Sequence, residues 1–145
     1  MTSPAAPFAR QATCVAIDGR GVLIEGPPGS GKSSLALALI DRGAQLIGDD
    51  GVMLAGEAGQ LIARPHPNTR GLLEVRNLGL LPFPCGAQAP VALVLVLDPA
   101  APRYIEAAGT IEAGGLALPC VRIWPQDPAP AIKAELALHR YGLCF

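Results

Sequence analysis

Apolar residues along the chain fall into short runs that are separated by turns containing glycine or proline. Runs of this length that are rich in Val, Ile and Leu predict β-strands. We expect such strands at residues 13–17, 21–25, 45–48, 52–54, 60–63, 72–76 and 121–124. The longest run, Val91–Leu97, is apolar at every position, and this predicts a strand that is buried on both faces.

Two segments have the pattern of helices. Residues Ser33–Arg42 are apolar on nearly all sides and are followed by Gly43, so we expect a helix that packs against a sheet and ends at a glycine. Residues Ala129–Tyr141 alternate apolar with charged positions, which predicts an amphipathic terminal helix. Many strands and few helices indicate an α/β protein with a mixed sheet rather than a regular alternation of strand and helix.

Length and charge restrict the class of protein. A chain of 145 residues corresponds to one domain. Eleven Lys and Arg against 12 Asp and Glu give a net charge of −1, which argues against broad electrostatic binding of nucleic acid or an anionic membrane. No apolar run approaches the ~20 residues that cross a bilayer. Residues 1–10 have no leader-like apolar run and are expected to be a flexible lead-in. The four cysteines lie far apart, so we expect reduced thiols, no zinc site and a cytoplasmic protein.

The strongest chemical signal is a P-loop, also called a Walker A motif. The segment fits G-x-x-x-x-G-K-[ST], with an apolar strand before it and a helix after it. The residues predicted to bind the nucleotide are Gly26, Pro27, Pro28, Gly29, Ser30, Gly31, Lys32, Ser33 and Ser34. Glycines allow backbone N–H groups to surround a phosphate at a helix N-terminus. Lys32 can reach the β- and γ-phosphates, and the Ser33 hydroxyl can bind Mg²⁺.

The pattern alone leaves the position of the catalytic carboxylate open. Asp98 follows the longest apolar run, as a Walker B aspartate would, but Asp-Pro also commonly begins a turn. The adjacent pair Asp49 and Asp50 follows the strand after the P-loop helix. Glu74 and Arg76 share one face of a predicted strand, which as a pattern is typical of a solvated face.

At this point the residues resemble a known family. The segment from Gly26 to Asp50 resembles the catalytic core of HPr kinase/phosphorylase, and Leu73–Gly79, read as Leu-Glu-Val-Arg-Asn-Leu-Gly, resembles the second signature of that family. The resemblance extends from Thr13 to the terminal helix. It implies a P-loop kinase-like fold in a single domain, residues 1–145. It also implies a truncated form, without the N-terminal domain of the longer family members.

The resemblance assigns roles to particular residues. Asp50 corresponds to the aspartate that accepts the proton of the substrate serine, and Asp49 is its supporting neighbour. Lys32 is the third catalytic residue, and Ser33 and Glu74 are associated with Mg²⁺. Arg76 belongs to the second signature. The implied cofactors are ATP and Mg²⁺, and Asp98 returns to a structural role.

Three positions depart from the family pattern. Gln11 stands fifteen residues before Gly26, where the family has a histidine, and Asn77 replaces a signature glycine. Residues Trp124–Pro128 replace a basic loop that is linked to the reverse reaction. The chain is therefore expected to lack phosphorylase activity. Neither His66, in a loop, nor His139, in the terminal helix, is expected to take over the role of the missing histidine.

The resulting hypothesis is a protein serine kinase that phosphorylates an HPr-like phosphocarrier of the phosphotransferase system. Membrane and nucleic-acid partners are not expected, and a homo-oligomer is left open. Two alternatives remain. A nucleotide-sensing module without catalysis is compatible with Gln11. A small-molecule P-loop kinase would need an arginine-rich lid, for which the sequence has no clustered candidates. A GTPase is disfavoured because the chain has no Asn-Lys-x-Asp motif.

Overall fold

Three parallel strands form the middle of the sheet in the computed structural model, which describes residues 6–145. They are β3 (Arg20–Glu25), β9 (Ala89–Leu97) and β11 (Leu116–Ile123), and β9 lies between the other two. The apolar run of β9 is buried along nearly its whole length, as its sequence predicts. Because the strands are parallel, their carboxyl ends meet at one edge, and the P-loop leaves the sheet there.

Antiparallel strands extend this centre on both sides. On one side, β2 (Thr13–Ile17) forms a hairpin with β3, and β4 (Gln45–Gly48) pairs with the far edge of β2. On the other side, β10 (Gly109–Ala113) pairs with β11. The β2–β3 turn is tight because Asp18 and Gly19 both adopt positive φ angles, of 50° and 80°. This arrangement places the start of β2 and the ends of β3 and β4 close to the P-loop.

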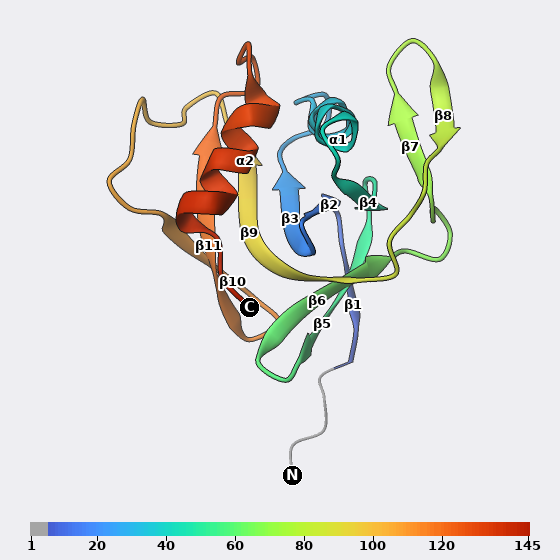
Figure 1. Ribbon diagram of the computed structural model, residues 1–145, viewed down its shortest axis with the longest axis horizontal. Coiled ribbons are helices and arrows are strands. Elements are labelled where there is room, and N and C mark those ends of the chain that lie inside the picture. Colours follow the sequence, from blue (N-terminus) through green and yellow to red (C-terminus); the bar gives the residue numbers. More distant parts are fainter. Residues whose placement is uncertain (1–5) are drawn as a thin grey trace.

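A second group of strands curls away from the centre (Figure 1). The hairpin β5 (Val52–Glu57) and β6 (Gln60–Pro65) joins the first residues of β9 through β6. The edge strand β1 (Phe8–Arg10) pairs with β5. A separate hairpin, β7 (Leu72–Val75) and β8 (Gly79–Pro82), stands apart from the nine-stranded sheet within residues 6–145.

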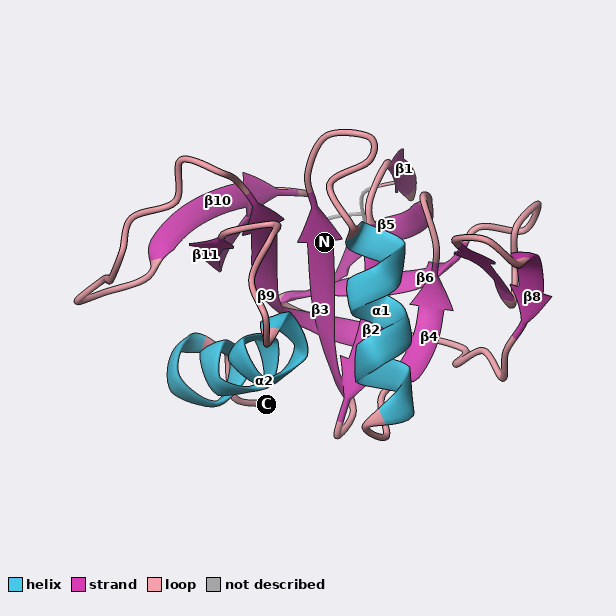
Figure 2. Cartoon of the chain, turned by 90° about the horizontal axis from the view of Figure 1, so that it is seen from above, coloured by secondary structure: helices cyan, strands magenta, loops and turns pink. Residues whose placement is uncertain are grey.

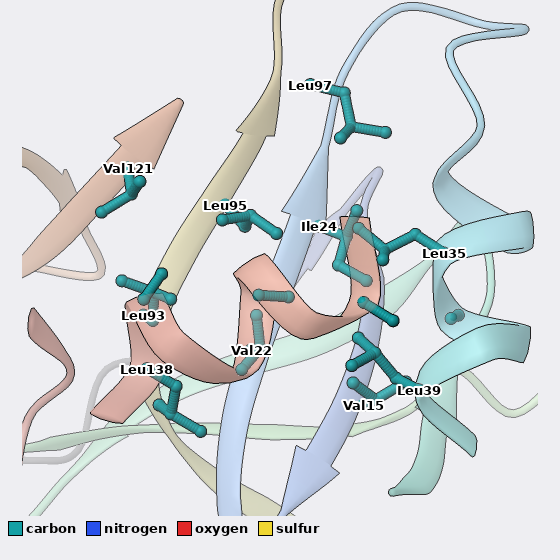
Figure 3. Close-up of a cluster of buried hydrophobic side chains, with 14 of the residues drawn as sticks. Val15, Val22, Ile24, Leu35, Leu39, Leu93, Leu95, Leu97, Val121 and Leu138 are labelled. Atoms are coloured by element: carbon teal, nitrogen blue, oxygen red, sulfur yellow. The ribbon is translucent and has the colours of Figure 1, made fainter. Parts of the chain in front are cut away.

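Both helices lie on the same side of the central strands (Figure 2). They are α1 (Lys32–Asp41), which follows the P-loop, and α2 (Pro130–Tyr141). Arg42 Nε donates to Glu135 Oε1 at 2.8 Å and so links the end of α1 to α2. In Figure 3, Ile24 and Leu95 of the sheet face Leu35 of α1 across the buried cluster between the layers. A second buried cluster fills the opposite face of the sheet.

The α/β class with a mixed sheet and few helices is confirmed. Every predicted strand and helix is present. The strands β5, β6, β9 and β11 are longer than expected, because their additional residues pair with other strands and the local sequence pattern does not reveal this pairing. The strands β1, β8 and β10 were not predicted.

The expectation of a flexible lead-in over residues 1–10 is wrong for Phe8–Arg10, since these residues pair with β5 and Phe8 packs on the second cluster. Residues 1–5 lie outside the described part. Among residues 6–145, no helix is long and apolar enough to cross a membrane.

Candidate functional site

The loop between β3 and α1 has the shape of an anion cradle. Gly31 adopts a φ of 101° directly before α1, a conformation that favours glycine. A Cβ atom on Gly26 would lie 2.6 Å from Ser30 Oγ, so the loop leaves no room for a side chain there. No side chain caps the N-terminus of α1, and its first turn carries no acidic residue. The free amides and the helix dipole therefore favour a bound anion such as a phosphate.

Two side chains of the loop have polar groups directed at its interior. Lys32 Nζ donates to the carbonyl oxygen of Gly26 at 2.9 Å, which holds the ammonium group over the loop. The buried Ser30 hydroxyl is the one side-chain N or O atom of the described chain that is buried without a hydrogen-bond partner. A buried polar atom without a hydrogen-bond partner is costly, and the loop contains such an unsatisfied hydroxyl group.

Asp49 is the buried centre of the site. Its Oδ1 accepts hydrogen bonds from Ser33 Oγ at 2.6 Å and from Thr13 Oγ1 at 3.0 Å. Its Oδ2 accepts from the backbone N–H of Glu74 at 2.9 Å. One carboxylate therefore joins α1, β2, the end of β4 and β7. A buried carboxylate is tolerated here because it accepts three hydrogen bonds.

Asp50 follows Asp49 directly, but its side chain points in a different direction. Its φ is 54°, in the left-handed region, which aspartate tolerates better than most residues. Its side chain is exposed and faces the cavity, whereas that of Asp49 is buried. The two adjacent acids therefore have different environments, and only Asp50 is accessible to a substrate.

These groups surround a cavity of about 190 Å³ at the N-terminus of α1. Glu74 and Arg76 reach it from the β7–β8 hairpin. Both side chains are exposed. The full lining consists of Gln11, Pro28, Gly29, Gly31, Lys32, Ser33, Ser34, Asp50, Glu74 and Arg76. The cavity combines cationic, carboxylate and hydroxyl groups at a phosphate cradle.

Most of the predicted site residues come together in this way. Gly26, Pro27 and Ser30 belong to the loop but are not among the residues that line the cavity. Asp49 does not line it either, but it is hydrogen-bonded to the lining residue Ser33. Gln11 lines the cavity, at the position where the resemblance places a histidine. His66 and His139 do not line it.

Asp98 is engaged elsewhere. Its Oδ1 accepts from the N–H of Ala100 at 2.8 Å, and its Oδ2 accepts from Arg122 at 3.2 Å. It is absent from the lining of the cavity. These contacts are those of a turn residue at a strand end, in agreement with the structural role expected for it.

Two features of the site were not predicted. The first is Thr13, whose hydroxyl contacts the Asp49–Asp50 segment. The second is a bidentate ion pair between Arg10 and Glu25, the residue directly before the P-loop. The hydrogen bond to Glu25 raises the pKa of Arg10 above its usual value. A lone hydroxyl in the otherwise apolar strand 13–17 is the one sequence signal that points to either feature.

The donor set fits a magnesium ion that is bound largely through phosphates. Ser33 and Glu74 offer oxygen atoms, which Mg²⁺ prefers. Within residues 6–145, no group of three or more His, Cys, Asp or Glu side chains forms a site that could hold a metal by itself. Mg²⁺ characteristically keeps several waters and binds through one or two protein oxygens plus substrate phosphates, a role that Ser33 and Glu74 could fill.

A second cavity, of about 270 Å³, lies between α2 and residues 102–105. Its lining is largely apolar and aromatic, with Tyr104, Trp124 and Leu136 among it. None of the predicted site residues contributes to it. The smaller cavity is the candidate site because it alone joins the phosphate cradle to carboxylates.

A P-loop that leaves a central parallel strand and opens a helix, in a mixed sheet with few helices, defines a P-loop kinase-like fold. More specifically, the chain belongs to the HPr Serine kinase C-terminal domain family, whose profile matches residues 5–84.

The similar proteins agree with this assignment. The HPr kinase/phosphorylase of Clostridium beijerinckii is 49% identical over 67 residues, which are 46% of this chain and 22% of that protein. The HPr kinase/phosphorylase of Mycoplasma mycoides is 44% identical over 64 residues, 44% of this chain and 20% of that protein. The chain therefore matches about a fifth of the length of these curated relatives.

The match in three dimensions is more extensive. The solved structure of the Hpr(Ser) kinase/phosphatase from Coxiella burnetii superimposes with a TM-score of 0.81 at 27% sequence identity. The superposition covers 91% of this chain and 94% of that chain. The shared fold thus extends well beyond the segments that match the curated relatives in sequence.

Proposed function

We propose that this protein is a serine kinase that uses ATP and Mg²⁺ to phosphorylate a serine of an HPr-like phosphocarrier of the phosphotransferase system. The observation that carries the proposal is the cavity in which Asp50 and Glu74 face Lys32 and Ser33 at a helix N-terminus. Bound ATP with Mg²⁺ would supply the phosphoryl group and neutralise part of its charge. In-line transfer to a hydroxyl depends mainly on positioning and charge stabilisation.

The P-loop supports the nucleotide half of this function. The amides that follow Gly31 and the Lys32 ammonium group would hold the phosphates. Ser33 and Glu74 would contribute oxygen atoms to the metal. Asp49 would orient the Ser33 hydroxyl, since it accepts that hydroxyl's hydrogen bond at 2.6 Å.

The acceptor half depends on Asp50. An exposed carboxylate beside the phosphate cradle can accept the proton of a substrate hydroxyl as the oxygen attacks. Asp49 cannot do this because it is buried and its oxygens already accept three hydrogen bonds. We therefore propose Asp50 as the general base and Asp49 as its supporting neighbour.

The partner is inferred from the relatives. Two of them are named HPr kinase/phosphorylases and one is named an Hpr(Ser) kinase/phosphatase. We propose the same type of acceptor for this chain, with residues 1–145 acting as one catalytic domain in the cytoplasm, and a homo-oligomer as an open arrangement. We further propose that the chain has kinase but no phosphorylase activity.

A second candidate function is a nucleotide-sensing module without catalysis. Gln11 favours it, because this side chain lines the cavity and cannot transfer a proton as an imidazole can. A small-molecule kinase has less support, since no arginine-rich segment faces the phosphate cradle among the described residues; Arg76 is the one arginine in the lining.

One assay separates these functions. The protein is incubated with labelled ATP, Mg²⁺ and an HPr-like phosphocarrier, and phosphoserine is measured beside nucleotide binding. Asp50→Asn is expected to lower transfer by ~10²–10⁴-fold and to leave ATP binding intact. Transfer that survives this substitution would remove Asp50 from the role of base. Binding without transfer by the wild-type protein would favour the sensing module.

A further inference from the structure

One buried hydroxyl group contacts both aspartates of the site. Thr13 on β2 is fully buried, and Thr13 and Asp49 are the two polar residues of the described chain that are buried as whole residues. Thr13 Oγ1 donates to Asp49 Oδ1 at 3.0 Å and accepts from the backbone N–H of Asp50 at 3.3 Å. A hydroxyl can make both bonds at once because it has one proton and two lone pairs.

The two aspartates that Thr13 contacts are adjacent but have different surroundings. Asp49 points inward to Ser33, and Asp50 points outward into the cavity. Asp50 also has a left-handed backbone, with a φ of 54°. Non-glycine residues keep this conformation only where their surroundings hold it. Thr13 Oγ1 is the side-chain atom that accepts the Asp50 N–H.

The neighbouring backbone leaves little freedom to compensate. A Cβ atom on Gly48 would lie 2.7 Å from the carbonyl oxygen of Gly51. The turn from β4 to β5 is therefore tight. Thr13 itself is not part of the cavity lining, so it acts only through the aspartates.

We propose that Thr13 is a positioning residue, whose hydroxyl holds Asp49 on the P-loop serine and directs Asp50 to the acceptor. This proposal rests on the proposed kinase function. It concerns the hydroxyl rather than the packing of the side chain, because the strand around it is apolar and a valine has a closely similar shape. Displacement of a catalytic group by ~1 Å can lower a rate ~10²-fold.

The test compares Thr13→Val, which removes the hydroxyl at nearly constant shape, with Thr13→Ser, which keeps it. Thr110→Val, on the exposed face of β10, is the control for a threonine outside the site. We expect Thr13→Val to lower kcat by ~10–10²-fold, with the KM for ATP changed by less than about twofold. Thr13→Ser and Thr110→Val should retain kcat close to that of the wild type.

A purely structural role of Thr13 would give a different result. It would lower the melting temperature of Thr13→Val and leave kcat per folded molecule unchanged, and this result would overturn the proposal.

A second measurement does not depend on activity. The Asp50 amide should be protected from hydrogen exchange in the wild type and in Thr13→Ser, and should lose that protection in Thr13→Val. If the wild type transfers no phosphate to any acceptor, the proposed function fails, and the Asp50 amide still decides whether Thr13 holds this backbone. Unchanged protection in Thr13→Val would refute the positioning role even if the kinase function is correct. If Thr13→Val does not fold, Thr13→Ala provides the same deletion with a smaller side chain.

Discussion

Ser33 Oγ lies 2.6 Å from Asp49 Oδ1, so the serine of the P-loop is bonded to the acid at the end of β4 rather than to the acid at the end of β9. In this chain the carboxylate that supports the phosphate loop therefore comes from the strand that follows α1. Asp98, the alternative, forms an ion pair with Arg122 instead. This relationship makes the two acids a natural pair for comparison.

We expect Asp49→Asn to be much more damaging than Asp98→Asn. An amide in place of the Asp49 carboxylate brings an NH₂ group against at least one of three donors, Ser33, Thr13 and the Glu74 amide. A buried polar group left in this way costs about 1–3 kcal/mol of stability. Urea unfolding of the variants measures this cost, and binding of Mg²⁺·ATP measures the effect on the loop.

Asp98→Asn serves as the matched substitution at the end of β9. It weakens a partly exposed ion pair, which contributes at most about 1 kcal/mol, and phosphoryl transfer should be unaffected. If Asp98→Asn is the variant with the larger loss of transfer, the catalytic acids have been assigned to the wrong strand.

Lys32→Ala should separate nucleotide binding from folding. A ligand that binds only the native state raises the melting temperature by mass action, so Mg²⁺·ATP is expected to stabilise the wild-type protein. Without the Lys32 ammonium group, most of this shift should disappear. Lys133→Ala is the control, because Lys133 is paired with Asp127 on the surface at α2. An equal shift in Lys32→Ala and the wild type would rule out the P-loop as the nucleotide site.

The parts of this protein that could be predicted from sequence are those determined by local pattern. The P-loop and β9 were predicted because the turn chemistry of Gly26–Gly31 and the apolar run 91–97 are each contained in a few consecutive residues. The contact of Thr13 with Asp49 could not be predicted from sequence, since it joins residues 36 positions apart. It depends on the pairing of β2 with β4, which neither segment reveals alone.

The different orientations of the two adjacent aspartates also could not be predicted from the local sequence. Asp49 and Asp50 are identical in type and adjacent in sequence, but Asp49 is buried and Asp50 is exposed with a positive φ. The backbone N–H of Asp50 is bonded to Thr13, 37 positions away, and the local sequence does not reveal this tertiary contact. Strand β1 was missed for a related reason, because Phe8–Arg10 is extended only through its pairing with β5.

The ion pair between Arg10 and Glu25 allows a test of whether the residue before the P-loop helps to position that loop. Arg10 binds Glu25 in a bidentate manner, and Glu25 is followed directly by Gly26. Arg10→Ala should therefore lower stability by an amount between the ~1 kcal/mol of exposed pairs and the ~3–5 kcal/mol of buried ones, since this pair is partly buried. It should also raise the KM for ATP, which steady-state kinetics would detect.

Arg64→Ala is a suitable control for that substitution. Arg64 makes a similar bidentate contact, with Glu57, but within the β5–β6 hairpin and with more exposed side chains. We expect it to leave the KM for ATP unchanged. Equal effects of the two substitutions on KM would mean that the Arg10 pair contributes nothing specific to the loop.

Alkaline pH should destabilise the protein through Cys14. Burial raises the pKa of the Cys14 thiol to about 12 from its ordinary 9.0, with a backbone hydrogen bond at Val22 acting in the opposite direction. Above pH 9 the unfolded chain loses the thiol proton, whereas the folded chain keeps it until about pH 12. The free energy of unfolding should therefore fall as the pH rises through this range, by at most about 1.4 kcal/mol per pH unit. Below pH 9 the thiol contributes no pH dependence.

The measurement compares unfolding of the wild type, Cys14→Ala and Cys144→Ala by urea from neutral pH to about pH 10.5. Other groups that titrate here are common to all three proteins, so the difference in slope reports Cys14. Cys144 is exposed, and its removal should not change the slope. Parallel curves for the wild type and Cys14→Ala would show that the Cys14 thiol does not retain its proton on folding.

The direction of the reaction is the last property that the site allows us to predict. Phosphorolysis of a phosphoserine acceptor needs a site that holds a second phosphate beside it. In the cavity that phosphate would meet the carboxylates of Asp50 and Glu74, with Arg76 as the one arginine of the lining. Residues 124–128 do not line this cavity, and Asp127 is paired with Lys133. We therefore expect no pyrophosphate from phosphorylated acceptor and inorganic phosphate. Gln11→His should not restore the reaction, because an imidazole supplies a proton-transfer group but no second anion site. Pyrophosphate formed by the wild type would contradict this prediction, and its loss in Arg76→Ala would then locate the anion at Arg76.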